Sequence, residues 1–269
     1  MQIVIVGVGY TGRRVLARLD PSKARGITRA DIDLDDQSPV MLELPETYSL
    51  LYTVPPRPDG NGDPRLERLL STLDPAPQRI VYLSTTGVYG DQAGRRVDET
   101  AALAPSTDRA KRRVAAESLL HEWCGKHDVD LVVLRVPGIY GPGRLGIERL
   151  QNAAPLIAEA DAGPGNRIHV DDLASCCIRA LDPDAPAGTY NVGDGDHRSS
   201  TSFARSVARL AGIDEPPEIP RAEAERTFSE GRLSFLRESR IVDTRRMEDV
   251  LGFVPRYTDP EAGIRASLA

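Results

Sequence analysis

The sequence predicts an α/β fold in which helices cover both faces of a doubly wound parallel sheet. Short, wholly apolar runs such as residues 2–6 are typical of strands that are buried on both faces of a parallel sheet. These runs alternate with segments whose apolar residues recur at helical spacing. Of the 269 residues, 40% are hydrophobic, so a full core can form and extensive disorder is excluded.

The first half of the chain is expected to supply one side of this sheet. Residues 2–6, 24–28 and 50–54 are predicted strands, and Pro55-Pro56 stops the third of them. A helix follows the first strand, with its apolar face at Val15, Leu16 and Leu19. Asp63-Pro64 suits the N-cap and first turn of a second helix. The apolar face of that helix comprises Leu66, Leu69, Leu70 and Leu73.

The second half is expected to complete the sheet and add a lobe. Residues 79–83 and 129–135 are predicted strands, and a helix over residues 108–124 separates them. Asp171 or Asp172 is expected to cap a further helix with a buried face of Leu173, Cys176, Cys177 and Ala180. From residue 185 onward the chain is loop-rich. We therefore expect a main domain at residues 1–184 and a small lobe at residues 185–269, interleaved with the end of the sheet.

Composition excludes several classes of protein. The 34 basic and 40 acidic residues give a formal net charge of -6, which disfavours a general nucleic-acid binder. No stretch approaches the roughly 20 apolar residues of a membrane span, and the first apolar run is too short for a signal peptide. Cys124, Cys176 and Cys177 show no disulfide framework and no metal-ligand spacing. We expect a cytoplasmic protein that needs no metal, membrane or nucleic acid.

A glycine turn follows the first predicted strand and opens the first helix. Residues 7–12 read GVGYTG, which fits the G-x-G-x-x-G pattern in its required context. Gly7 allows a tight turn, Gly9 lets the backbone approach a pyrophosphate, and Gly12 permits close packing of helix on sheet. The backbone N–H groups at Tyr10 and Thr11 are then available to phosphate oxygens. The turn predicts a Rossmann-type fold that binds a dinucleotide.

The choice of dinucleotide depends on the residues after the second strand. An acidic residue there usually binds the ribose hydroxyls of NAD, whereas an arginine suits the 2'-phosphate of NADP. The sequence has Thr28-Arg29 at this place, so Arg29 favours NADP. Asp31 and Asp33 follow closely and leave NAD open, and Arg29 as a solvated surface residue is the remaining alternative.

Several motifs together resemble the extended and atypical short-chain dehydrogenase/reductase superfamily, and most nearly its NAD-dependent epimerase/dehydratase-like proteins. They are GVGYTG (7–12), YLSTTGVYG (82–90), RVPGIYGP (135–142), NRIHVDD (166–172) and LGFVP (251–255). Their order along nearly the whole chain is more specific than any one of them. The resemblance implies that further residues contact the cofactor: Thr53, Val54, Pro55, Ser84, Pro137 and Gly138.

The resemblance also implies a catalytic set that this chain does not carry in full. The family uses a Ser/Thr, a Tyr that moves the proton, and a Lys four residues after the Tyr. Thr85 matches the Ser/Thr, but Arg109 and Arg113 stand at the Tyr and Lys positions. Of the basic residues only Lys23, Lys111 and Lys126 are lysines, and no Tyr-x-x-x-Lys occurs in any register. Arginine stays protonated near pH 7, so Arg109 cannot act as the general acid.

Two interpretations of function remain open at the level of the sequence. The first is an NADP-dependent oxidoreductase or epimerase-like enzyme in which another group, such as Tyr89 or Tyr140, supplies the proton. Arg109 and Arg113 would then hold an anionic group of a small-molecule substrate or of the cofactor. The second is a catalytically silent NADP-binding sensor or assembly protein. We expect a monomer or a homodimer in either case.

Overall fold

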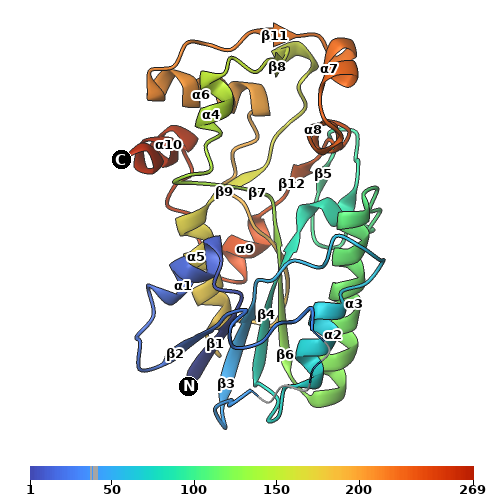
Figure 1. The fold of residues 1–269 in the computed structure, drawn as a ribbon, viewed down its shortest axis with the longest axis vertical. Coiled ribbons are helices and arrows are strands. Elements are labelled where there is room, and N and C mark those ends of the chain that lie inside the picture. The colour runs from blue at the N-terminus through green and yellow to red at the C-terminus, as the bar shows by residue number, and fades with distance from the viewer. Residues whose placement is uncertain (37, 39–41) are drawn as a thin grey trace.

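The centre of the molecule is a parallel β-sheet (Figure 1). The structure is a computed structural model that describes residues 1–36, 38 and 42–269. Within these residues a six-stranded sheet runs in the order β2 (Ala24–Ile27), β1 (Gln2–Val6), β3 (Tyr48–Tyr52), β4 (Arg79–Thr85), β6 (Asp130–Val136) and β10 (Gly188–Asn191). Each neighbouring pair of these strands is parallel. The predicted doubly wound parallel sheet is confirmed.

Helices cover both faces of this sheet. On one face lie α2 (Pro64–Ser71) and α3 (Asp108–His127), and on the other α1 (Tyr10–Leu16) and α5 (Val170–Leu181) (Figure 1). Successive side chains of a strand point to opposite faces. Ile80 and Tyr82 of β4 therefore join the core under α2 and α3, whereas Val81 and Leu83 join the core under α1 and α5. Burial on both faces explains why the strands read as continuous apolar runs.

Two local expectations about the elements were wrong. β3 covers Tyr48–Tyr52 and not residues 50–54, because Tyr48 is fully buried and its hydroxyl donates a hydrogen bond of 2.9 Å to the carbonyl of Pro75. The N-cap of α5 is His169 and neither of the aspartates, because its Nδ1 accepts from the backbone N–H of Asp171 at 3.1 Å.

Asp172 has a different partner. Its buried carboxylate accepts hydrogen bonds from the backbone N–H groups of Arg256 and Tyr257, at 3.1 and 2.9 Å. These bonds hold the C-terminal segment against α5. Arg256 and Tyr257 lie in the segment that leads to the last helix, α10 (Pro260–Leu268).

A lobe stands above the carboxyl ends of the strands (Figure 1). Its elements are α4 (Ile147–Gln151), β8 (Leu156–Ile157), η2 (Glu159–Asp161), α6 (Ser200–Ala211), β11 (Glu218–Ile219), α7 (Arg221–Thr227), α8 (Glu230–Leu236) and α10. Its core combines Leu150 and Leu156 with Val207 and Ile264. These residues come from both sides of residue 184, so the lobe is built from separate stretches of the chain.

Short strand pairs connect the lobe to the sheet. β7 (Gly138–Tyr140) pairs with β9 (Arg167–His169), and β5 (Arg96–Val97) pairs with β12 (Ile241–Val242). Of two further short helices, η1 (Thr86–Tyr89) directly follows β4 and contacts α3, and α9 (Arg245–Asp249) contacts β10. Of the helices in the described part of the chain, none is long and apolar enough to cross a membrane.

Candidate functional site

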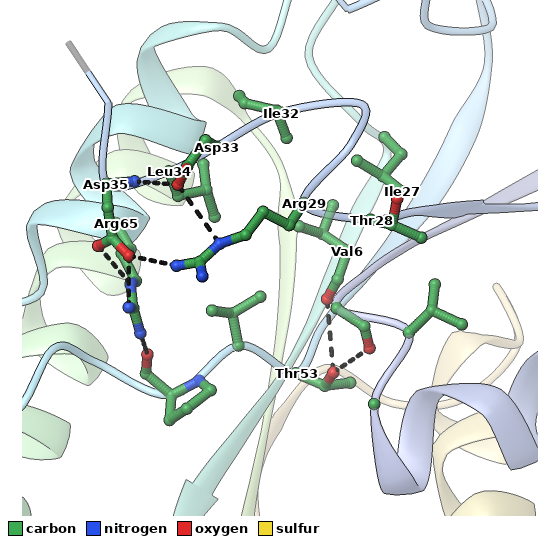
Figure 2. Close-up of a pocket in the computed structure, with 15 residues that line it drawn as sticks. Val6, Ile27, Thr28, Arg29, Ile32, Asp33, Leu34, Asp35, Thr53 and Arg65 are labelled. Atoms are coloured by element: carbon green, nitrogen blue, oxygen red, sulfur yellow. Dashed lines mark hydrogen bonds and ion pairs between the residues drawn. The ribbon is translucent and has the colours of Figure 1, made fainter.

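The strand order creates a crevice where ligands bind in open α/β sheets. From β1 the chain passes to β2 on one side, while β3 lies on the other side, so the order reverses at β1. Ligands bind at the carboxyl ends of the strands beside such a point. A cavity of about 360 Å³ lies there (Figure 2). Its lining comprises Val6, Gly7, Val8, Gly9, Ile27, Thr28, Arg29, Ile32, Asp33, Leu34, Asp35, Thr53, Val54, Pro55 and Arg65.

The glycine turn forms one wall of the cavity and is as tight as its sequence predicts. Gly7 has a φ of +97°, and a Cβ on it would lie 2.6 Å from Oγ1 of Thr53. That hydroxyl donates a hydrogen bond of 2.6 Å to the carbonyl oxygen of Gly7. A Cβ on Gly12 would overlap the same carbonyl oxygen, whereas a Cβ on Gly9 would meet nothing within 4 Å. The turn therefore leaves open space at Gly9, where a pyrophosphate would approach the backbone.

The cavity brings together part of the expected cofactor site. Gly7, Gly9, Arg29, Thr53, Val54 and Pro55 all line it. Among the described residues, the lining does not include Tyr10, Thr11, Gly12, Ser84, Pro137 or Gly138. Thr11 and Gly12 are buried at the start of α1. Pro137 is partly exposed between β6 and β7, and Gly138 is exposed as the first residue of β7.

Tyr10 links the glycine turn to the loop after β7. Its hydroxyl donates to the carbonyl of Pro142 at 3.0 Å. The guanidinium groups of Arg14 and Arg144 lie 4.4 and 3.9 Å from the centre of its ring. Its side chain is therefore fixed by the loop, and its backbone N–H remains at the start of α1.

The acidic residues near Arg29 divide into two groups. Asp31 turns back to the chain, because its carboxylate accepts from the N–H and the hydroxyl of Thr28, each at 2.8 Å. Asp33 and Asp35 line the cavity and pair with Arg29, at 3.6 and 2.7 Å. Ile32 and Leu34 alternate with these aspartates in sequence, are buried in the core and also line the cavity. Of the two acidic residues that the sequence left ambiguous, Asp33 lines the cavity and Asp31 does not, because Asp31 is held by Thr28.

Asp35 and Arg65 are site residues that the sequence reasoning missed. Arg65 lies in the first turn of α2, and its Nε and Nη2 donate to the two carboxylate oxygens of Asp35 at 2.8 and 2.6 Å. This pairing holds the pKa of Asp35 at about 2. The available signal for Asp35 was its position two residues after Asp33 and six after Arg29, in the same loop after β2.

Thr85 and the arginines of α3 lie together at the end of β4. Thr85 is partly exposed, and its Oγ1 accepts from the backbone N–H of Gly87 at 3.2 Å. Nη1 of Arg113 donates to the carbonyl of Leu83 at 2.8 Å and to the hydroxyl of Tyr82 at 2.9 Å. Arg109 is exposed one turn earlier on the helix. Arg113 is thus tied to the strand that carries Thr85.

Tyr89 and Ser84 belong to a buried polar network beneath these groups. Tyr89 is fully buried, its hydroxyl donates to Oδ1 of Asn191 at 2.7 Å, and it accepts from Nη1 of Arg135 at 2.8 Å. Arg135 pairs with buried Glu117 at 2.8 Å, and Ser84 donates to the same carboxylate. Burial raises the pKa of Tyr89. Both side chains are bonded within this buried network, at the ends of β4 and β6.

The lobe contains a second set of buried polar groups. Asp194 is 3% exposed, and burial raises the pKa of its carboxyl to about 7. Tyr140, the other tyrosine weighed as a proton donor, is 4% exposed and stacks edge-on with His169 and Phe203. In the described part of the chain, neither Oδ2 of Asp194 nor the hydroxyl of Tyr140 has a hydrogen-bond partner.

Comparisons with known proteins agree with this arrangement. The profile of the NAD dependent epimerase/dehydratase family matches residues 66–193. The chain is 29% identical to the protein YeeZ of Escherichia coli (strain K12) over 237 residues, which cover 85% of this chain and 77% of YeeZ. A solved structure of a conserved protein of unknown function from Silicibacter pomeroyi superposes with a TM-score of 0.81 at 28% identity, covering 99% of this chain and 97% of that one.

A human relative in the fold has been solved with a dinucleotide. The human epimerase family protein SDR39U1, whose structure contains NADPH, superposes with a TM-score of 0.75 and covers 100% of this chain and 98% of that one. Its sequence is 16% identical, so this similarity concerns the fold.

Proposed function

We propose that this chain, whose residues 66–193 match the NAD dependent epimerase/dehydratase family and which is 29% identical to YeeZ, binds NADP between β1 and β3 and acts as an oxidoreductase or epimerase-like enzyme. The observation that carries this proposal is the cavity, which joins the glycine turn to Arg29 and to the residues after β3. The same site supports binding of a dinucleotide whether or not a reaction follows. We expect a small-molecule substrate with an anionic group.

The residues around the cavity fit the adenosine half of NADP. The adenine ring can pack against apolar surface from Ile27, Ile32 and Val54, and Thr53 also lines the cavity (Figure 2). Gly9 leaves room for the pyrophosphate, as a side chain there would project into open space. Arg29 is 71% exposed in its side chain and can turn toward a 2'-phosphate. When bound, the nicotinamide ring supplies hydride transfer.

Thr85 is suited to hold the reacting oxygen of a substrate. Its Oγ1 already accepts a hydrogen bond from Gly87, so the hydroxyl proton remains available for donation to a carbonyl oxygen. Arg113 contributes a permanent positive charge beside the end of β4. Arg109 is exposed on the first turn of α3, where its positive charge suits an anionic substrate group. Under this assignment Thr85 orients the substrate and the two arginines supply positive charge. The proton then comes from water or from the substrate itself.

A catalytically silent binding protein is the second candidate. Specific support comes from the sequence, which lacks Tyr-x-x-x-Lys, and from the complete burial of Tyr89. General acid–base catalysis typically contributes about 10²–10⁴ in rate, so an enzyme without it is slow unless another group takes over. The cofactor site is the same under this alternative.

A hydride-transfer screen separates the two candidates. The protein is incubated with NADPH and a panel of carbonyl compounds and nucleotide sugars, and cofactor oxidation is followed. The enzyme predicts turnover with at least one class and loss of that turnover in Thr85→Val. Binding of NADPH with no oxidation across the panel would favour the silent protein.

The cellular setting is also a proposal. Cys124, Cys176 and Cys177 are free and buried, which suits a reducing compartment, and we expect the protein in the cytoplasm. We expect it to work as a monomer or a homodimer.

A further inference from the structure

Several arginines converge on one carboxylate at the wall of the cavity. Asp35 pairs with Arg29 at 2.7 Å, with Arg57 at 3.8 Å and with Arg65 at 2.6 Å. We call Arg29, Arg57 and Arg65 the arginine cluster. Its members come from the end of β2, from the loop after β3 and from the first turn of α2. The fold therefore gathers them from separate segments around Asp35, at the edge of the sheet where the dinucleotide would lie.

The members of the arginine cluster differ in side-chain exposure and in how firmly their partners hold them. The side chain of Arg65 is 18% exposed, and besides its two bonds to Asp35 it donates to the carbonyl of Pro55 at 3.0 Å. Arg29 is 71% exposed and reaches Asp35 with one hydrogen bond (Figure 2). Arg57 is 39% exposed and is shared with Asp59. Arg65 is thus a fixed element of the wall, whereas Arg29 and Arg57 can change partners at little cost.

The pairing between Arg65 and Asp35 has the geometry that also suits a phosphate. Two parallel N–H groups of a guanidinium donate to two oxygens of one anion, which is the strong bidentate arrangement. The hydrogen bonds from Arg65 and the charges of the arginine cluster lower the pKa of Asp35 to about 2, so the carboxylate is ionised at neutral pH. Asp35 is 24% exposed in its side chain and lines the cavity, so a ligand can reach it.

We propose that, in the cofactor-free protein, the carboxylate of Asp35 is the partner that Arg29 exchanges for the adenosine 2'-phosphate, and that the positive charge of the whole arginine cluster favours this phosphate. The inference rests on the proposed binding of NADP and adds Arg57, Arg65 and Asp35 as determinants of cofactor choice. Arg29 leaves Asp35 for the phosphate, and Arg57 and Arg65 balance the added negative charge. Because Asp35 competes for the same guanidinium groups and repels a dianion, it lowers the preference for NADP over NAD.

The test uses the adenosine half of the cofactor alone. Affinities of the intact protein for 2',5'-ADP and for 5'-ADP are measured by titration calorimetry, and their ratio reports the 2'-phosphate. In the wild type 2',5'-ADP binds more tightly. In Asp35→Asn, which keeps the shape and one acceptor oxygen but removes the charge, the ratio rises about tenfold. Asp31→Asn is the matched control, because it removes the same charge from the same loop at a residue bonded to Thr28. Its ratio changes less than twofold.

A second variant tests the arginine cluster without touching the fold. Arg57→Met removes an exposed member, and the preference for 2',5'-ADP falls severalfold while the thermal unfolding midpoint stays unchanged. An unchanged or lower ratio in Asp35→Asn, with both nucleotides still bound, overturns the role of Asp35 and leaves dinucleotide binding standing. Absence of binding of either nucleotide by the wild type overturns the proposed function and this inference together.

Discussion

Under the proposed function, Arg29 is the residue on which a preference for NADP depends. In the cofactor-free protein it makes exposed ion pairs, which contribute little to stability. We expect Arg29→Ala to weaken NADPH binding by about 1.5–3 kcal/mol, the range for hydrogen bonds to charged groups, and to leave NADH binding nearly unchanged. Fluorescence titration of the reduced nicotinamide measures both. Equal losses for the two cofactors would remove Arg29 from the 2'-phosphate site.

Gly9 and Gly12 provide a matched pair at the same turn. A side chain at Gly9 enters the open cavity, whereas one at Gly12 overlaps the carbonyl of Gly7. Gly9→Val is therefore expected to abolish binding of both dinucleotides and to lower the free energy of unfolding less than Gly12→Val does. Urea denaturation and cofactor titration of the two variants check this. Undiminished binding in Gly9→Val would show that the turn is not part of the site.

Asp194 makes the stability of the protein depend on pH. Its carboxyl pKa is raised to about 7, so the folded state holds this proton more tightly than the unfolded state, and stability falls as pH rises through this range. Arg167, Asp196 and Tyr140 are the charged or titratable groups that act on it. Relative to Asp194→Asn, the wild type is expected to lose about 2–3 kcal/mol of unfolding free energy between pH 5 and pH 8. Urea denaturation across this range measures it, and a difference that is constant with pH would contradict it.

Physical reasons explain which residues of the candidate site could be predicted from the sequence and which could not. Gly7, Gly9 and Arg29 were predictable, because a turn beside a buried strand constrains its neighbours over a few residues. Arg65 was not, since it reaches Asp35 from a position 30 residues away and only the folded crevice brings them together. Tyr89 was predicted at the correct end of β4, but its burial depends on Arg135 and Asn191 from other strands.

Among the elements, α3 carries the residues whose substitution distinguishes an enzyme from a catalytically silent binding protein. Arg109→Tyr with Arg113→Lys restores the residue types of the family at the start of this helix, where Ala110 lies against η1. A lysine can still donate to Leu83 and Tyr82. We expect NADPH-dependent turnover in the double variant to exceed that of either single variant by about 10²-fold or more. Turnover no higher than in the single variants would mean that the scaffold itself no longer supports the reaction.

Elements of the sheet were far more predictable than those of the lobe. The strands are buried on both faces, so their apolar runs identify them without knowledge of their neighbours. The lobe consists of short helices and two-residue strands whose partners lie far away, as when Leu156 of β8 pairs with Glu218 of β11. No local pattern specifies such a pairing. The cap of α5 shows the same limit, because His169 takes the place that an aspartate usually has.

At the scale of the whole molecule, the lobe and the sheet form an interlocked unit. The carboxylate of Asp172 holds the backbone at Arg256 and Tyr257, and the strand pairs β7–β9 and β5–β12 tie the lobe to the ends of β4 and β6. In Figure 1 the lobe stands above the carboxyl ends of the strands and α3 lies below it. The cavity is lined by residues at the ends of β1, β2 and β3. A dinucleotide bound there would extend from Arg29 across the glycine turn toward Thr85.

The most direct test of the account is an equilibrium titration of the wild-type protein with NADPH and with NADH. Nicotinamide fluorescence is the signal, because Trp123 lies near the far end of α3 and stacks on His127. We predict saturable binding of one dinucleotide per chain, with NADPH bound at least tenfold more tightly than NADH, and loss of both in Gly9→Val. Absence of saturable binding of either dinucleotide would contradict the assignment of the cavity as the cofactor site.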